Sequence, residues 1–304
     1  MTLHSVTIAE GGDAFDDDPR EQVMSMKSIL VPMEPHDGMA SVLETALLLA
    51  RKCDSYIEGF PLRFGISEFV AVDPAGSIPL ESYRQESLEE AAQARKMFEG
   101  FMTERSIPRA GAASKGLSCA WLDEAPEGEG FVGSYGRVFD VTVLGRPDAN
   151  TIGLHNRAIE SGLFESGKPI LLAPPTPPKQ IATNILIHWN CSTEQARTTA
   201  FAMPLLHQAS QVTVLFVPGG QGVPGPSAEQ FLRHLHFNGI PAKLKTVNLD
   251  GKTTGQVILE QAKAEGCDLL VKGAYTQSRL RQMIFGGATS HILAHADLPV
   301  FMAH

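Results

Sequence analysis

A glycine-containing segment near the carboxyl terminus has the residue types of a phosphate-binding loop. Lys272-Gly273 begins the segment, Gly286-Gly287-Ala288-Thr289 ends it, and Arg279 and Arg281 lie between. Glycine lets backbone amides approach a phosphate closely, and the amino terminus of a following helix adds a favourable dipole. Arginine can add charge-assisted hydrogen bonds. The segment therefore predicts binding of a small anion.

Other patterns that could carry chemistry lack the partners they need. His291 and His295 are four residues apart, but no HExxH glutamate and no third ligand accompany them, so we predict no metal site. Gly251-Lys252-Thr253 resembles the end of a Walker A motif, but Thr246 stands where that motif needs glycine. The cysteines form no CxxC pair and are expected to be reduced and mostly buried: Cys53, Cys119, Cys191 and Cys267.

Length and composition favour a folded chain with two medium-sized domains. The 304 residues exceed the roughly 100–200 residues of one common domain. Hydrophobic residues make up 43% and charged residues 19%, which is typical of globular proteins. The net charge of -9 argues against nucleic acid as a partner. We find neither a signal peptide nor an apolar run of about 18 residues, and we therefore expect a cytoplasmic protein without a membrane span.

Three segments recur in the same order and indicate an internal duplication. Residues 29–34, 140–145 and 168–173 match residues 185–190, 268–273 and 298–303. The proline-rich stretch 174–178 separates the two copies as a stiff spacer. We therefore predict a flexible acidic tail over 1–25, a first domain over 26–175 and a second domain over 176–304.

Alternating apolar and amphipathic segments predict a parallel sheet flanked by helices. In the second copy the expected strands are 185–188, 212–217, 244–247, 269–272 and 300–302, with helices in the gaps. Ser192 and Gln195 have the spacing of a capping box. In the first copy an insertion over 61–83 is expected to be a loop that leads into a helix over 86–101. The predicted fold class is α/β, with two doubly wound five-stranded parallel-sheet domains.

A ligand of such a sheet binds outside the carboxyl ends of the strands, where the strand order reverses. In the second copy this point lies between the first and fourth strands. We therefore expect residues 189–192 and 273–276 to face each other across a crevice.

The second copy resembles the universal stress protein family, whose phosphate loop reads Gly-x-x-Gly, nine residues, then Gly-Ser or Gly-Thr. Gly273 and Gly286 match two motif glycines, whereas Thr276 replaces the second glycine and Gly287 replaces the hydroxyl residue. The resemblance implies an adenine nucleotide alpha hydrolase-like fold in a tandem arrangement, with ATP or another adenine nucleotide as the cofactor. It places Asn190 where the family has an adenosine-contacting aspartate and Val217 near the adenine. The site residues expected on this basis are Asn190, Cys191, Val217, Lys272, Gly273, Thr276, Gly286, Gly287, Ala288 and Thr289.

The first copy lacks these features and is expected to be a structural partner without a nucleotide site. Asn156 and Arg157 stand opposite Gly286 and Gly287, and Glu34 takes the position of Asn190. A carboxylate at that position would repel an anionic ligand.

The resemblance favours a non-catalytic stress-response module that binds an adenine nucleotide or small anion weakly. A slow ATP hydrolase is an alternative, although Asn190 cannot act as a general base. A ligand-free dimerisation scaffold is the third reading. The resemblance also implies a homodimer or an intramolecular pseudo-dimer, in which strands 169–173 and 299–303 are the edges that pair.

Overall fold

The computed structural model describes residues 26–63, 65, 79–111, 115–146, 152–220, 222–274 and 287–304, and its elements fall into two halves. The amino-terminal half contains β1 (Ser28–Met33), α1 (Met39–Cys53), β2 (Tyr56–Pro61), α3 (Leu80–Glu104), β3 (Ser118–Trp121), α4 (Gly130–Gly136), β4 (Val141–Gly145), α5 (Ile152–Glu165) and β5 (Ile170–Ala173). The carboxyl-terminal half contains β6 (Asn184–Trp189), α6 (Thr193–Leu206), β7 (Gln211–Phe216), α7 (Ala228–Phe237), β8 (Ala242–Thr246), α8 (Thr254–Ala264), β9 (Leu269–Val271), α9 (Gly287–His295) and β10 (Val300–Met302).

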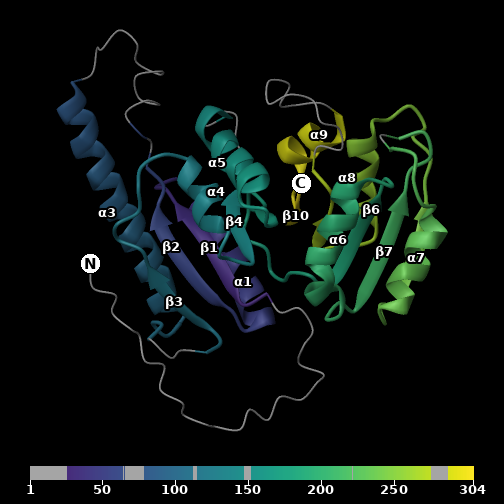
Figure 1. The fold of residues 1–304 in the computed structure, drawn as a ribbon, viewed down its shortest axis with the longest axis horizontal. Coiled ribbons are helices and arrows are strands. Elements are labelled where there is room, and N and C mark those ends of the chain that lie inside the picture. The colour runs from purple at the N-terminus through teal and green to yellow at the C-terminus, as the bar shows by residue number, and fades with distance from the viewer. Residues whose placement is uncertain are drawn as a thin grey trace, which may run out of the picture.

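The strands form one sheet in the order β3-β2-β1-β4-β5-β10-β9-β6-β7-β8. Each half contributes five strands that pair in parallel, which confirms the predicted doubly wound fold. The halves meet where β5 and β10 pair antiparallel, with Leu171 opposite Phe301. Figure 1 shows the two halves side by side. The expectation that these two strands pair is therefore confirmed, and both partners belong to one chain.

The central strands are buried on both faces, as parallel strands between two helical layers must be. Five of the six residues in β1 and in β6 are buried, and only the first residue of each strand is partly exposed. Buried side chains of α1, α3, α6 and α7 pack on one face, and those of α4, α5, α8 and α9 pack on the other. Each apolar layer includes residues from both halves, so the core continues through the β5–β10 junction.

Two local predictions change when the structure is considered. The helix expected over 86–101 begins earlier and ends later, at Leu80 and Glu104, while residues 64 and 66–78 of the insertion lie outside the described residues. Ser192 caps α6 by accepting the Gln195 N–H, but the Gln195 side chain does not return to the cap. Its amide oxygen accepts a hydrogen bond from Gly273 instead.

The expected acidic tail, residues 1–25, also lies outside the described residues.

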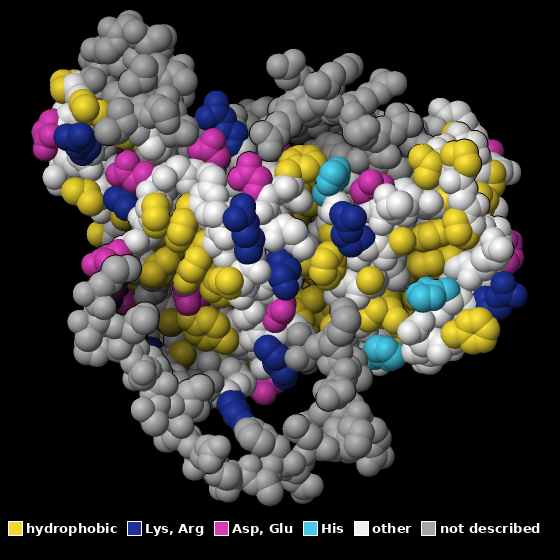
Figure 2. All heavy atoms as spheres, in the orientation of Figure 1, with side chains coloured by type: hydrophobic (Ala, Val, Ile, Leu, Met, Phe, Trp, Pro, Cys, Tyr) yellow, Lys and Arg dark blue, Asp and Glu magenta, His cyan; other side chains and the backbone are white. Residues whose placement is uncertain are grey.

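The surface carries a mixture of side-chain types. On the face shown in Figure 2, acidic and basic side chains lie interspersed among apolar ones over both halves. Within the described part of the chain, no helix combines the length and the apolar character that crossing a membrane requires.

Candidate ligand-binding site

The predicted crevice lies at the carboxyl ends of β6 and β9, which are neighbours in the sheet. Asn190 follows β6, Gly273 follows shortly after β9, and the two residues lie at the same end of the sheet. The Gly273 N–H donates to Gln195 Oε1 at 2.7 Å, so the first turn of α6 is bound to the segment after β9. The structure therefore brings the two predicted sides of the crevice together.

Asn190 shapes the turn from β6 into α6. Its Oδ1 accepts hydrogen bonds from Ser192 N at 3.2 Å and from Ser192 Oγ at 2.8 Å. Ser192 Oγ in turn accepts the Gln195 N–H at 3.1 Å. An amide oxygen can make these contacts as well as a carboxylate, which explains how the turn keeps its form with asparagine at this position.

Lys272 is a buried cation beside this turn. Its side chain is 4% exposed, and its Nζ donates to Gly273 O at 2.8 Å and to Thr289 Oγ1 at 2.9 Å. No acidic side chain pairs with this ammonium among the residues that the structure describes. Burial lowers the pKa of Lys272 to about 8, because the charged form loses its hydration.

His188 is the neighbour of Lys272 across the β6–β9 pair. The register joins Ile187 to Val271, and each of these residues directly precedes one of the two basic side chains. Burial, together with the smaller effect of the Lys272 charge, lowers the pKa of His188 to about 3. His188 Nδ1 is buried and accepts or donates no hydrogen bond within the described chain. A buried ring nitrogen without a partner is uncommon and calls for an explanation.

A pocket of about 230 Å³ opens next to His188 and Asn190. Its other wall is the segment that follows β7, including Val217 and Gly222. Because a cavity of about 150 Å³ can hold benzene, this pocket has room for a ring system of modest size. Asn190, Cys191 and Val217 were predicted site residues, and all three line it.

Of the segment after β7, sequence reasoning named only Val217 and missed the residues that follow it. Val223 N donates to Asn190 O at 3.1 Å, which holds the segment against the turn after β6. A Cβ at Gly225 would lie 2.8 Å from Cys191 O, so a side chain there would push the two backbones apart. The signal that could have revealed this contact is the run of glycine and proline over 218–226.

Cys191 and Trp189 are held by contacts that limit their chemistry. Cys191 has a φ of 65°, its Sγ donates to Pro226 O at 3.2 Å, and burial raises the pKa of its thiol. Trp189 stacks on Phe231 with ring centroids 4.0 Å apart, and its indole N–H donates to Pro226 O. Both side chains therefore pack against the segment that ends at Pro226.

The first turn of α9 forms the remaining side of the site. Gly287 has a φ of 72°, which glycine adopts readily but serine or threonine would adopt at a cost of about 1–2 kcal/mol. Glycine at position 287, where the family motif has a hydroxyl residue, therefore suits the local backbone conformation. Ala288 and Thr289 are buried, and Thr289 contacts Lys272. Thr276, Gly286, Arg279 and Arg281 lie outside the described residues.

The two histidine side chains of α9 pack against each other. The rings of His291 and His295 stack 4.3 Å apart, and His295 Nδ1 lies 2.9 Å from His291 O. Among the described residues, no group of three or more His, Cys, Asp or Glu side chains could hold a metal ion.

At the equivalent position of the amino-terminal half, the described side chains contact the protein itself. His36 Nδ1 accepts the Gly38 N–H at 3.0 Å, and its ring lies under 4 Å from where a Cβ of Gly145 would be. Arg146, which follows β4, donates to Ala296 O in the other half. That this half lacks a nucleotide site stays a prediction.

Comparison with known proteins agrees with this architecture. Residues 228–304 match the family model described as "Universal stress protein family". A universal stress protein structure from Archaeoglobus fulgidus DSM 4304 has a TM-score of 0.70 at 14% identity, covering 92% of this chain and 96% of that chain. A candidate universal stress protein from Pseudomonas aeruginosa UCBPP-PA14 has a TM-score of 0.51 at 14% identity, covering 91% of this chain and 93% of that chain. No curated protein matches the chain.

The fold and the crevice define an α/β protein built from two doubly wound halves, with a ligand-sized pocket at the strand ends of the second half. Residues 228–304 form the part of that half matched by the family model, and they include Lys272, Gly273 and the first turn of α9. Over these residues the chain is similar to the universal stress protein family.

Proposed function

We propose that the carboxyl-terminal half binds an adenine nucleotide, or another small anion, at the carboxyl ends of β6 and β9. The observation that carries this proposal is the buried Lys272 ammonium, which has hydrogen bonds to Gly273 O and Thr289 Oγ1 but no acidic partner in the described chain. A buried charge without a counter-charge is costly, and an anion beside it removes that cost.

The pocket and the cation divide the site into two chemical parts. The 230 Å³ pocket between Asn190, Val217 and Gly222 would take the base, because its walls are largely apolar and its rim carries backbone polar groups. Lys272, Thr289 and the amino terminus of α9 would take the anionic part, where the helix dipole also favours negative charge.

We propose further that the protein is a non-catalytic stress-response module that acts in the cytoplasm. The side chains that line the pocket are poor general bases: Asn190 is an amide, and the pKa of His188 is about 3. Lys272, which follows β9, contacts Thr289 of α9. Ligand binding would therefore act by changing the position of α9 relative to the segment after β9.

Calorimetric titration with ATP, ADP and AMP tests the proposal, performed in two buffers of different ionisation enthalpy at a pH near the Lys272 pKa of about 8. An anion should raise that pKa, so binding should take up roughly half a proton per site at this pH. Lys272→Met should weaken binding about ten- to hundredfold and abolish the proton uptake, because the variant keeps the side-chain volume and removes the charge. Lys263→Met, at an exposed lysine of α8, is the matched control.

The possible results separate the three functional readings. Binding without proton uptake, or with full affinity in Lys272→Met, would refute the role of Lys272. Release of phosphate from ATP above the blank would favour the hydrolase. No heat with any of the three nucleotides or with inorganic phosphate would leave the ligand-free scaffold. Gly273→Val is unsuitable as a probe, since a Cβ at Gly273 would lie 2.5 Å from Gln195 N and displace α6.

A further inference from the structure

A second cavity lies in the amino-terminal half, away from the crevice described above. It has a volume of about 200 Å³ and lies between the second half of α3, residues 107–110 and the edge strand β3. Residues 108–110 pair with Cys119 through Cys119 N–Pro108 O and Ala110 N–Cys119 O hydrogen bonds, so this segment closes the cavity from the side.

The inner wall of this cavity is apolar and firmly packed. Phe98 and Met102 of α3 are 1% and 2% exposed, and Phe98 packs against Trp121 with ring centroids 5.4 Å apart. Both rings press on Gly59 of β2, where a Cβ would lie 2.7 Å from Phe98. Burial raises the pKa of the Cys119 thiol, so this part of the wall is also uncharged at neutral pH.

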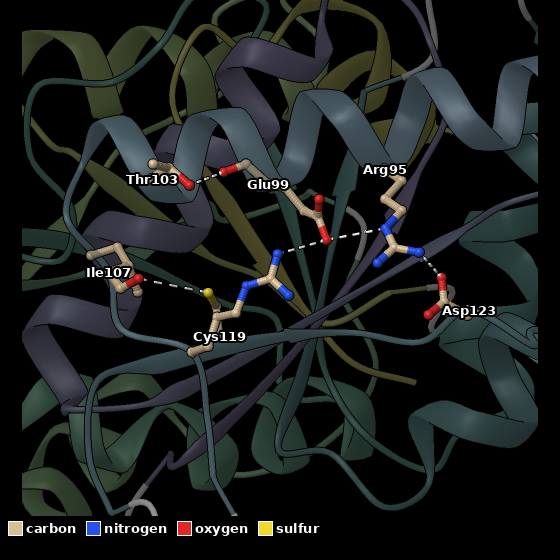
Figure 3. Close-up of polar contacts among 7 residues, drawn as sticks. Arg95, Glu99, Thr103, Ile107, Cys119 and Asp123 are labelled. Carbon is tan, nitrogen blue, oxygen red and sulfur yellow. Dashed lines mark hydrogen bonds and ion pairs between the residues drawn. The ribbon is translucent and has the colours of Figure 1, made fainter.

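The outer rim carries two guanidinium groups that converge on one carboxylate. Glu99 Oε1 accepts from Arg95 Nε at 3.1 Å and from Arg109 Nη2 at 2.9 Å. Arg95 also pairs with Asp123, so it lies between two carboxylates, as Figure 3 shows. A guanidinium has five N–H donors, and these contacts use one donor of Arg109 and two of Arg95. Both arginines therefore retain donors at the mouth of the cavity.

The rim lies between the cavity and open solvent. A shallower depression of about 580 Å³ on the outer side of α3 shares Arg95, Glu99, Thr103 and Arg109 with the cavity. The Arg109 side chain is 74% exposed and that of Asp123 is 58% exposed. A ligand can therefore reach the apolar chamber past side chains that are free to adjust.

The size and chemistry of the cavity select one class of small molecule. A dry cavity of about 150 Å³ accepts benzene, so 200 Å³ accommodates one aromatic ring with a short substituent. The remaining guanidinium N–H donors match the two oxygens of a carboxylate, whereas an ammonium group has no acceptor to offer them. We propose that this cavity binds a monocyclic aromatic carboxylate, with the ring against Phe98 and Trp121 and the carboxylate on Arg95 and Arg109.

The test is a titration of the full chain with benzoate, followed by ligand-observed NMR and by tryptophan fluorescence. Trp121 lines the cavity, and the chain has only one other tryptophan, Trp189, which packs in the other half. Trp189→Phe therefore leaves Trp121 as the reporter. Saturable binding of benzoate is expected, with acetate and benzylamine at least tenfold weaker, because acetate lacks the ring and the benzylamine ammonium group has no acceptor for the guanidinium donors.

Arg109→Gln tests the role of the rim. Its exposed side chain can be replaced without disturbing the core, and the variant should bind benzoate about tenfold or more weakly. Arg84→Gln is the matched control, because Arg84 is an exposed arginine of the same helix whose ion pair with Glu81 is remote from the cavity. The proposal is overturned if benzoate shows no saturable binding at millimolar concentration, if benzylamine or acetate binds as well, or if Arg109→Gln binds benzoate like Arg84→Gln.

Discussion

A protonated Lys272 and a neutral His188 lie side by side where β6 and β9 end. Lys272 keeps two hydrogen bonds that favour its charged form, whereas His188 Nδ1 has no partner in the described chain. Burial therefore opposes the charge of His188 more effectively than that of Lys272. The result is a neutral imidazole that faces the pocket beside a cation that faces α9.

The neutral state of His188 predicts a loss of stability in acid. The unfolded histidine takes up a proton near its ordinary pKa of 6.5, but the folded one does so only near pH 3. Its contribution is therefore complete above pH 6.5 and is lost as the pH falls towards 3, by at most about 1.4 kcal/mol per pH unit. His188→Leu should lose less stability than the wild type between these limits, as measured by urea unfolding at several pH values.

A residue of the same strand that does not titrate provides the control for this experiment. Ile187→Val removes a buried methylene but no ionisable group, so it should follow the acid dependence of the wild type. Equal pH dependence of His188→Leu and the wild type would contradict this prediction, because it would mean that the pKa of His188 is the same in the folded and unfolded chains.

At the scale of elements, one side chain decides how α6 meets the sheet. Gln195 and Gln256 both occupy the third position of a helix after a Ser or Thr cap. Gln256 completes a capping box with Thr253 at the surface, whereas Gln195 is fully buried and accepts the Gly273 N–H. The same local pattern therefore has two outcomes, and burial near the β9 end selects between them.

This difference predicts unequal costs for the same substitution. Gln195→Leu should reduce the free energy of unfolding by about 2–3 kcal/mol, because the buried Gly273 N–H loses its acceptor. Gln256→Leu should cost about 0.5–1 kcal/mol, which is the usual effect of a weakened helix cap. Chemical denaturation of both variants measures the difference, and a cost for Gln195→Leu no larger than that for Gln256→Leu would contradict the role of the buried contact.

For the whole molecule, the antiparallel β5–β10 pair joins two similar halves into one sheet. Leu171 and Phe301 are opposite each other in this pair, are fully buried, and belong to an apolar layer that extends into both halves. A core that is shared in this way should couple the unfolding of the two halves.

The coupling predicts that both halves unfold in one transition. Trp121 reports the amino-terminal half and Trp189 the carboxyl-terminal half, so Trp189→Phe and Trp121→Phe each leave one reporter. Leu171→Ala should lower the stability of both single-tryptophan proteins by a similar amount, about 2–5 kcal/mol. Denaturation curves followed by fluorescence check this, and a shift confined to the Trp121 reporter would show that the halves unfold independently.

The sequence by itself determined the local pattern of this protein: the alternation of strands and helices, the duplication and the end of the sheet where a ligand would bind. These features follow from periodicity and from strand order, which are properties of neighbouring residues. The domain boundaries 26–175 and 176–304 and the binding of a nucleotide stay predictions.

Only the tertiary structure decided which side chains complete the site and how the halves combine. His188 and Lys272 are 84 residues apart in the chain but adjacent in the sheet, so their mutual burial has no local signal. The same holds for the Gln195–Gly273 contact and for the position of His36 beside Gly145. Each of these contacts depends on which polar groups are buried together. The packing between helices and strands determines which groups those are.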